Sequence, residues 1–381
     1  MLRLVLLSVL LLISLLTLFT APAYYLWLLA VMVGEYGLLF IGSTLIILAS
    51  GWLTKSKYNA LGTFIGILAL ALLMLPIIEA FTIAQKLPNQ MQRELKLKTL
   101  NDEKPFSFLR LFVKDPKSTP KTLNYVTYPD TSLTLDYYAA ETSAKRPCVI
   151  VVHGGSWSSG DSKQLPELNT ILAAKGYQVA SINYRLAPKW HNPAPVEDVR
   201  LALSYLTSHA NELHIDTSQF VLLGRSAGAQ IALLAAYTLK NPGIKGVVNF
   251  YGPADMVWGY SLPAPKLVMD SRGVMENYLG GTYNQVPQNY KTSSPVEYVD
   301  LESVPTLTIH GANDALVAYE HSCRLNNKLQ ENGISHFWLK LPWATHGFDH
   351  HLNGPGGQLS TYAVLNFLNN VVPVEHMHQH Y

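Results

Sequence analysis

The chain has 381 residues, of which 49% are apolar and only 14% are Asp, Glu, Lys or Arg. Charged residues make up about a quarter of an ordinary soluble domain, so this composition predicts apolar membrane segments in addition to a globular part. The formal net charge of +2 gives no reason to expect nucleic acid as a partner.

The first 85 residues carry almost no charge and contain three apolar runs. Each run is long enough to cross a bilayer as a helix, which predicts a multi-pass membrane protein. Glu35 interrupts the second run, where a carboxylate needs a partner or an interfacial position. For the first run, a cleaved signal peptide with a site near Ala21 is the alternative. We expect the spans at about residues 4–21, 26–50 and 60–83.

Lysine and arginine favour the cytoplasmic side of a membrane, and the basic residues around this segment (residues 1–85) support both possible orientations. Arg3, Lys55 and Lys57 would leave the rest of the chain on the non-cytoplasmic side, which we favour. Four basic residues beyond the third run argue for the opposite side. Residues 86–120 form a juxtamembrane connector, which is either solvated or contains a helix lying on anionic headgroups.

From residue 121 to 373, apolar strand-like runs alternate with helical stretches. This alternation predicts an α/β fold in which a mostly parallel, eight-stranded sheet carries helices on both faces. The first two strands, at residues 123–128 and 132–139, form an antiparallel start. Residues 253–304 are long for a connection and rich in tyrosine, so we interpret them as a lid or pocket wall, with a surface elaboration as the alternative. Residues 374–381 form a tail, which is expected to be disordered or, alternatively, to bind metal loosely through its histidines.

The strand that begins at Cys148 ends in a glycine loop with the sequence HGGSW at residues 153–157. Acyl transfer places negative charge on a carbonyl oxygen, and fixed backbone N–H groups stabilise that charge. We expect the donors of this oxyanion hole to be the amides of Gly155, Ser156 and, further along the chain, Ala227. A phosphate-binding glycine turn is the alternative, although neither a G-x-G-x-x-G pattern nor a P-loop lysine accompanies the loop. The residues expected to support the loop are His153, in a structural role, Gly154 and Trp157.

An apolar run at residues 220–223 is followed by the sequence GRSAG and then by a helical run. A serine between two glycines at a strand-to-helix turn is the pattern of a nucleophile elbow, which lifts the hydroxyl above the sheet edge. Ser226 is therefore the candidate nucleophile, with an idle serine in an ordinary turn as the alternative. Gly224 and Gly228 make the tight turn possible. Arg225 either has a structural role facing solvent or binds an acidic part of a substrate.

Two further strand-like runs, at residues 305–311 and 334–341, each end in a loop with a candidate catalytic residue. The first loop contains Asp314, and the second contains His346. The chain order serine, aspartate, histidine is that of one of the well-known serine-hydrolase scaffolds. In such a triad the serine attacks the acyl carbon, the histidine transfers the proton and the aspartate orients the histidine. Asp255 is the alternative acid.

Asp349, His350 and His351 crowd the loop that contains His346, and metal binding is an alternative role for them. No second ligand cluster is evident in the sequence, so neither a metal nor another cofactor is expected. All candidate site residues lie beyond Cys148, so we expect the chain from about residue 105 onward to suffice for the chemistry.

Residues 123–372 resemble α/β-hydrolases of the hormone-sensitive-lipase-like carboxylesterase group. The resemblance rests on the HGGSW loop, the NYRLAP segment at residues 183–188, the GRSAG elbow and the positions of the aspartate and the histidine. It covers about two thirds of the chain and implies a Ser-His-Asp esterase without a cofactor. The chain departs from the family pattern in two places, because Ser156 replaces the third glycine of the loop and Arg225 stands where relatives often carry an acid or an amide.

Three functions are compatible with these motifs. The first is a membrane-anchored serine esterase for an apolar or lipid ester, and the similarity of the layout to isoprenylcysteine methylesterases makes a prenylated methyl ester one option. The second is a serine peptidase or amidase on the same fold. The third is a non-catalytic binding protein, which the presence of all three triad residues disfavours. Membrane lipids are expected partners of the apolar runs, and the motifs do not identify any protein partner.

Overall fold

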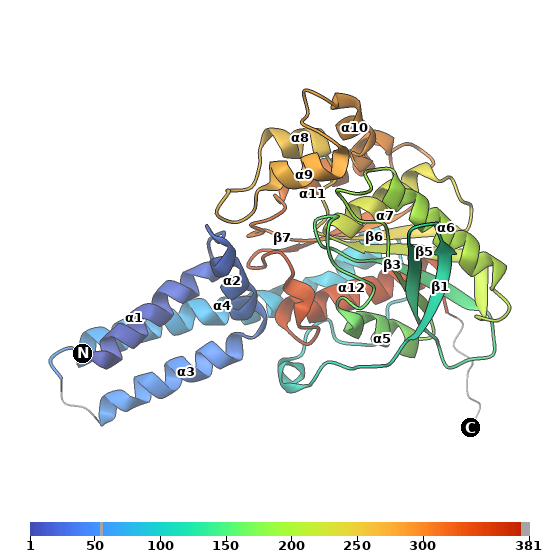
Figure 1. Cartoon of the computed structure of the whole chain (residues 1–381). Helices are drawn as coiled ribbons and strands as arrows, with labels where there is room; N and C mark the ends of the chain where they lie inside the picture. Colours follow the sequence, from blue (N-terminus) through green and yellow to red (C-terminus); the bar gives the residue numbers. More distant parts are fainter. Residues whose placement is uncertain (54–55, 375–381) are drawn as a thin grey trace, which may run out of the picture.

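The computed structural model describes residues 1–53 and 56–374. It consists of an α/β domain from which an arm of helices, formed by the N-terminal part of the chain, extends to one side (Figure 1). Lys55, used above for sidedness, and the tail from residue 375 onward lie outside the described residues.

The α/β domain is built on an eight-stranded sheet with the strand order β1-β2-β4-β3-β5-β6-β7-β8. β2 pairs antiparallel with β1 and with β4, and all other pairs are parallel. This confirms the predicted mostly parallel sheet with an antiparallel start. The strands are β1 (Lys121–Thr127), β2 (Ser132–Tyr138), β3 (Arg146–Val152), β4 (Gln178–Ile182), β5 (Ile215–Arg225), β6 (Ile244–Phe250), β7 (Thr306–Gly311) and β8 (His336–Leu341).

Helices cover both faces of the sheet, because the central strands are apolar on both sides. In β3, Cys148, Ile150 and Val152 pack with α6 and α7, whereas Val149 and Val151 pack with α5 and α12. The insertion after β6 forms three short helices above the carboxyl ends of the strands (Figure 1). The helices of the domain are α5 (Pro166–Ala174), α6 (Ala194–Ser208), α7 (Ala227–Thr238), α8 (Met256–Ser261), α9 (Ser271–Leu279), α10 (Pro287–Thr292), α11 (Glu320–Glu331) and α12 (Pro355–Val371).

The arm consists of α1, α2, α3 and the first half of α4, and it corrects the prediction of about three transmembrane helices. Within the described residues, only α4 is by itself long and apolar enough to cross a membrane. α2 and α3 pass that test only as a pair, and they are bent by 84° at the break between them. The helices are α1 (Leu2–Ser14), α2 (Tyr24–Glu35), α3 (Gly37–Ala49) and α4 (Asn59–Glu94).

The prediction was wrong because hydropathy does not register breaks in a helix. The first apolar run changes to a short 3-10 turn, η1 (Leu15–Thr17), and then leaves helical geometry before α2 begins. The second run breaks at Tyr36, next to Glu35 and Gly37. Both breaks lie close to the α/β domain, so the chain turns where the arm meets it (Figure 1).

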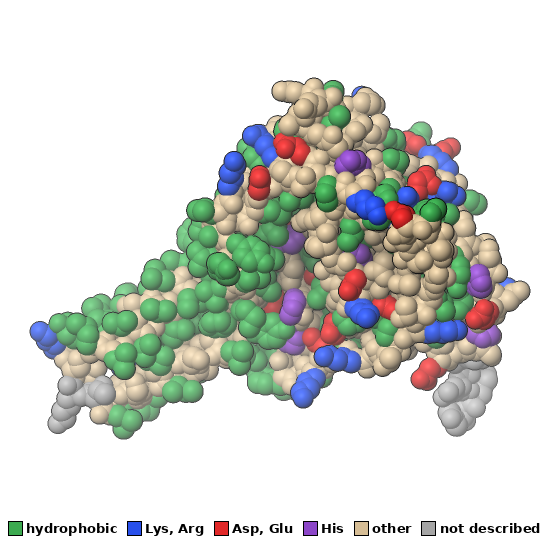
Figure 2. Space-filling model, in the orientation of Figure 1, with side chains coloured by type: hydrophobic (Ala, Val, Ile, Leu, Met, Phe, Trp, Pro, Cys, Tyr) green, Lys and Arg blue, Asp and Glu red, His purple; other side chains and the backbone are tan. Residues whose placement is uncertain are grey.

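The arm exposes an apolar surface that is unusual for a soluble protein. Leu12, Leu39, Ile46, Phe64 and Ile67 are all exposed, and most of the large exposed hydrophobic side chains of the described chain lie before residue 82. Figure 2 shows hydrophobic side chains along the whole visible face of the arm, with charged groups concentrated on the α/β domain. Extended apolar patches of this kind mark surfaces that contact a partner or a membrane.

α4 connects the two parts without a break. Its 36 residues give a length of about 54 Å. The first half of α4 packs along α1 and α3. Leu87 and Met91, near its end, are fully buried in the α/β domain, where they belong to the same core as α5 and α12. The direction of the arm is therefore fixed by packing inside the domain.

Glu35 holds the bend between α2 and α3 against the domain. Its carboxylate is 3% exposed and accepts a hydrogen bond from the backbone N–H of Gly356, in the first turn of α12, at 2.9 Å. The first N–H groups of a helix have no partner within the helix, so they need an acceptor from elsewhere. The first turn of α12 thus supplies a hydrogen-bond donor for the carboxyl group of Glu35, which stands in an apolar run.

We expect Glu35→Ala to weaken this attachment. The substitution leaves the buried N–H of Gly356 without an acceptor, which costs about 1–3 kcal/mol. Thermal unfolding of the full chain in detergent measures the loss. Glu79→Ala is the control, because Glu79 lies on α4 and is half-buried. Equal destabilisation by the two substitutions would contradict the special role of Glu35.

Candidate active site

Ser226 lies at the turn between β5 and α7, in a strained backbone conformation with φ 53° and ψ −122°. A non-glycine residue rarely adopts a positive φ, and such strain persists only where the surroundings enforce it. The backbone N–H of Ser226 donates to the carbonyl of Phe250 at 2.9 Å. A Cβ on Gly228 would lie 2.2 Å from the carbonyl oxygen of His153, so the turn requires glycine there.

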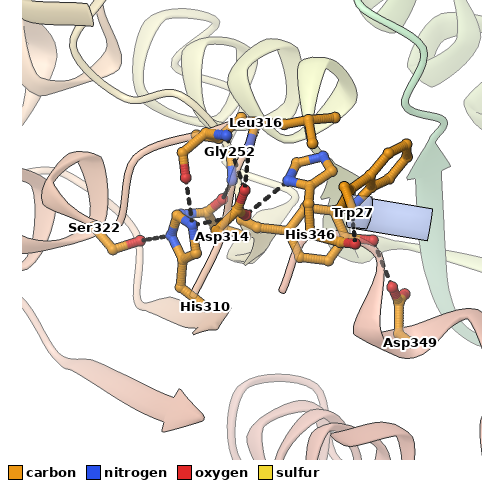
Figure 3. Close-up of polar contacts among 11 residues, drawn as sticks. Trp27, Gly252, His310, Asp314, Leu316, Ser322, His346 and Asp349 are labelled. Atoms are coloured by element: carbon orange, nitrogen blue, oxygen red, sulfur yellow. Dashed lines mark hydrogen bonds and ion pairs between the residues drawn. The ribbon is translucent and has the colours of Figure 1, made fainter. Parts of the chain in front are cut away.

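Asp314 follows β7 and is the centre of a buried hydrogen-bond network (Figure 3). One carboxylate oxygen lies 2.7 Å from His346 Nδ1 and 3.1 Å from His310 Nε2. The other accepts the backbone N–H groups of Leu316 and Val317, each at 2.9 Å. Burial acts to raise the pKa of Asp314. His346 and His310 have the larger, opposite effect through their charges and hydrogen bonds, and they hold the pKa of Asp314 below its usual value. The carboxylate is therefore ionised and orients Nδ1–H of His346 toward itself.

Ser226 and Asp314 line one cavity of about 200 Å³. His346 is not part of this lining; its imidazole is bonded to Asp314, and its ring centre lies 4.4 Å from that of Tyr251. Across the described parts of the chain, no hydrogen bond joins Ser226 Oγ to His346. In enzymes without substrate this contact is often long and tightens only in the complex. The structure thus brings the three residues into one region, with the Asp314–His346 pair fully formed.

The HGGSW loop contributes Ser156 and Trp157 to the lining of the same cavity and carries backbone N–H groups without an acceptor. Gly155, Ser156 and Trp157 have φ values of 118°, 53° and 59°, so three successive residues adopt positive φ. Among the residues that the structure describes, the N–H groups of Gly155, Ser156 and Ala227 have no hydrogen-bond acceptor. Ser156, Trp157 and Ala227 line the cavity together with Ser226. A group of unpaired N–H donors of this kind can bind an oxyanion.

The residues around this loop fix its shape. The ring of His153 is buried and stacks on Tyr184 with ring centres 4.3 Å apart, and burial lowers the pKa of His153. Trp157 stacks on Tyr278 of α9 at 4.4 Å and donates from Nε1 to Gln230 at 2.9 Å. The insertion after β6 therefore reaches the loop through α9.

Arg225 has a structural role, but in the core rather than facing solvent. It is 2% exposed, and its Nε lies 2.5 Å from a carboxylate oxygen of Asp349. The hydroxyl of Tyr251 donates to the other oxygen of Asp349. Burial and the pairing with Asp349 argue against a role of Arg225 in binding an acidic substrate group.

The alternative site residues lie elsewhere. Asp255 caps α8 by accepting the N–H of Trp258 at 2.9 Å and pairs with Arg324 at 3.3 Å. His351 lies 2.9 Å from Asp115. In residues 1–53 and 56–374, no group of three or more His, Cys, Asp or Glu side chains is placed to hold a metal ion.

Sequence analysis missed four residues of this region. His310 lies within β7 and gives Asp314 a second imidazole partner. His321 lines the cavity, and burial lowers its pKa to about 3, so it is neutral. Thr20 lines the cavity and Trp27 contacts His346 from the arm. The position of His310 four residues before the acid is a signal that the sequence does contain, whereas nothing local marks Thr20 or Trp27.

We expect Arg225→Met to destabilise the protein by about 3–5 kcal/mol, because it leaves the charge of Asp349 buried and unpaired. The double variant Arg225→Met/Asp349→Asn should recover part of this loss. Chemical unfolding of the full chain in detergent measures both. Arg200→Met is the matched control, because Arg200 forms an exposed pair with Glu197 that contributes at most about 1 kcal/mol. A higher KM for an ester with unchanged stability would instead indicate a substrate-binding role.

The chain is similar in sequence to known esterases. The family profile BD-FAE matches residues 135–329, about half of the chain. Esterase LipC of Mycobacterium tuberculosis (strain ATCC 25618 / H37Rv) is 29% identical over 242 residues, which cover 59% of this chain and 58% of the relative. The probable carboxylic ester hydrolase LipM of the same strain is 28% identical over 244 residues, covering 60% of this chain and 56% of LipM. The chain thus matches less than two thirds of the length of these curated relatives.

Solved structures show the same fold. Esterase 2 of Thermogutta terrifontis, phosphonylated by sarin, superimposes with a TM-score of 0.57 and 19% identity over 69% of this chain and 100% of the esterase. A truncated carbohydrate esterase from gut microbiota has a TM-score of 0.54 and 22% identity over 67% of this chain and 96% of that enzyme. The fold of residues beyond the arm is therefore that of α/β-hydrolases. The assignment to the hormone-sensitive-lipase-like group stays a prediction.

Proposed function

Because the chain belongs to the BD-FAE family, we propose that it is a membrane-attached serine esterase that cleaves an apolar carboxylic ester through an acyl-enzyme. One observation carries this proposal. The buried Asp314–His346 pair stands beside a cavity that Ser226 shares with the free N–H groups of the HGGSW loop. Nucleophile, base, acid and oxyanion donors are the complete set that acyl transfer requires.

Each group has one role in the proposed reaction. Ser226 Oγ attacks the acyl carbon while His346 Nε2 takes its proton, and the same proton then goes to the leaving alcohol. Asp314 holds the imidazole in the tautomer with Nδ1–H and stabilises its charged form. The N–H groups of Gly155, Ser156 and Ala227 bind the oxyanion. Water then attacks the acyl carbon while His346 takes its proton, the bond between the acyl group and Ser226 Oγ breaks, and the proton returns to Oγ as the carboxylic acid leaves.

The walls of the cavity support an apolar substrate. Leu262, Pro265 and Met269 come from the insertion after β6, and Leu316 and Val317 follow the acid. Such a lining gains free energy from contact with hydrocarbon and offers few partners for a charged group. The insertion therefore acts as a pocket wall that selects the acyl or alcohol part.

The exposed surface of the arm supports attachment to a membrane. The part of α4 from Leu61 to Phe81 carries exposed hydrophobic side chains and matches the roughly 20 residues that a span requires. Arg3 lies at the far end of the arm, where its guanidinium bonds to the carbonyls of Ile47 and Asn59. A basic group at this end favours a cytoplasmic tip, which leaves the α/β domain on the non-cytoplasmic side.

Ser226→Ala should lower ester turnover by several orders of magnitude, because loss of the nucleophile removes the acyl-enzyme route. A fluorophosphonate probe should label the wild-type protein at Ser226, which peptide mass spectrometry locates. Ser204→Ala, an exposed serine on α6, is the control and should retain full activity. Asp314→Asn should cause a severe loss of ester turnover, whereas Asp255→Asn should cause only a mild loss. Undiminished turnover by Ser226→Ala would refute the mechanism, and faster cleavage of an amide than of the matched ester would favour a peptidase.

The full chain should sediment with membranes and resist extraction by carbonate and by high salt. Salt screens electrostatic attachment but leaves burial of apolar side chains in lipid unchanged. Immunoblotting of the fractions and the intact mass of the extracted protein provide the measurement. Release into the soluble fraction with a new N-terminus near Ala23 would show that the first apolar run is a signal peptide.

A further inference from the structure

The arm contacts the residue proposed as the catalytic base. Trp27, on α2, donates from Nε1 to the backbone carbonyl oxygen of His346 at 2.9 Å (Figure 3). Its ring also lies against the imidazole, with ring centres 6.5 Å apart and an angle of 60° between the planes. Trp27 thus touches both the backbone and the side chain of His346.

The hydrogen bond restrains a peptide group that little else holds. The carbonyl of His346 belongs to the peptide that precedes Gly347, which has a φ of 79°. Nothing lies within 4 Å of the position that a Cβ on Gly347 would occupy, so packing does not restrain this side of the turn. Glycine moves freely between backbone conformations, and the indole N–H fixes the one seen here. Asp314 holds the other end of the same residue at Nδ1.

The same part of the arm also touches the loop of the acid and the pocket wall. Asn313 donates to the carbonyl of Thr17 at 3.2 Å, one residue before Asp314. The N–H of Tyr24 donates to the carbonyl of Leu267, in the insertion after β6, at 2.9 Å. Thr20 lines the cavity that contains Ser226. Residues 17–27 therefore contact the loops that carry the acid and the base as well as the cavity itself.

We propose that Trp27 is a positioning residue for His346 and that residues 17–27 of the arm complete the active site. This inference rests on the proposed esterase function and extends it. The arm then has two roles, since it attaches the protein to the membrane and holds the base in the orientation that proton transfer needs. The expectation that residues from about 105 onward suffice for the chemistry is replaced by the opposite one.

Trp27→Phe in the full chain, purified in detergent micelles, tests the proposal. Phenylalanine keeps an aromatic ring but removes the N–H donor. Trp52→Phe is the matched control, because Trp52 lies on the same arm and is 92% exposed. The measurements are kcat and KM for a soluble short-chain aryl ester and the rate of fluorophosphonate labelling at Ser226.

We expect Trp27→Phe to lower kcat and the labelling rate about 10-fold to 100-fold, the cost of a small misplacement of a catalytic group. KM should stay the same, because the cavity that binds the ester is unchanged. If Trp27 had a structural role alone, Trp27→Phe would lower the melting temperature without lowering kcat selectively at constant KM. Trp52→Phe should match the wild type in every measurement.

Two results would overturn the inference, and they are distinguishable. If the wild type turns over ester and is labelled but Trp27→Phe behaves as Trp52→Phe does, the positioning role is wrong and the esterase function stands. If the wild type neither turns over ester nor is labelled, the proposed function itself is wrong. Should Trp27→Phe fail to fold, replacement of Trp27 by β-(3-benzothienyl)alanine exchanges only the N–H for sulfur and preserves the shape. That protein must show the same loss of kcat.

Discussion

The continuity of α4 is the constraint on which the other contacts depend. One half of the helix packs along α1 and α3, and the other half is buried in the core of the α/β domain beside α12. A continuous helix transmits direction over its whole length, so burial of Leu87 and Met91 sets where the arm leaves the domain. With that direction fixed, the bend between α2 and α3 meets the N-terminus of α12, and α2 runs past the loop of the base. A break in α4 would remove the constraint that brings the α2–α3 bend to α12 and α2 to the loop of His346.

The loop of residues 343–351 is one of the surfaces at which the arm and the domain meet. A Cβ on Gly34 would lie 3.7 Å from Trp343, and Tyr36 stacks on His351 with ring centres 4.5 Å apart. From the domain side, the buried pair of Arg225 and Asp349 links the same loop to the elbow. The residue that precedes the nucleophile is therefore linked to the loop that carries the base. The same ion pair therefore helps to hold the strained backbone at Ser226 and the loop that carries His346.

The sequence predicts the sheet and most of the candidate site because these depend on local patterns. Parallel strands place their carboxyl ends at one edge, so loops that follow different strands converge wherever they occur in the chain. Ser226, Asp314 and His346 each follow a strand, so their convergence can be predicted without knowledge of side-chain packing.

Contacts between segments that are distant in the sequence have no such pattern. Trp27 and His346 are 319 residues apart, and Arg225 pairs with an aspartate that its sequence neighbourhood does not mark. Glu35 marks an interruption of the second apolar run, but the apolar composition on both sides of it does not show that the helix bends there.

The burial of α4 also determines how this protein can be engineered. Between the arm and the first strand, Leu87, Met91, Leu95, Leu97 and Phe106 all belong to the core on one face of the sheet. Deletion of everything before residue 105 would remove Leu87, Met91, Leu95 and Leu97 from this core and expose the apolar side chains that they cover. A water-soluble version therefore has to be made by replacing the outward-facing hydrophobic side chains of the arm with polar ones. Shortening the chain removes part of the core along with the anchor.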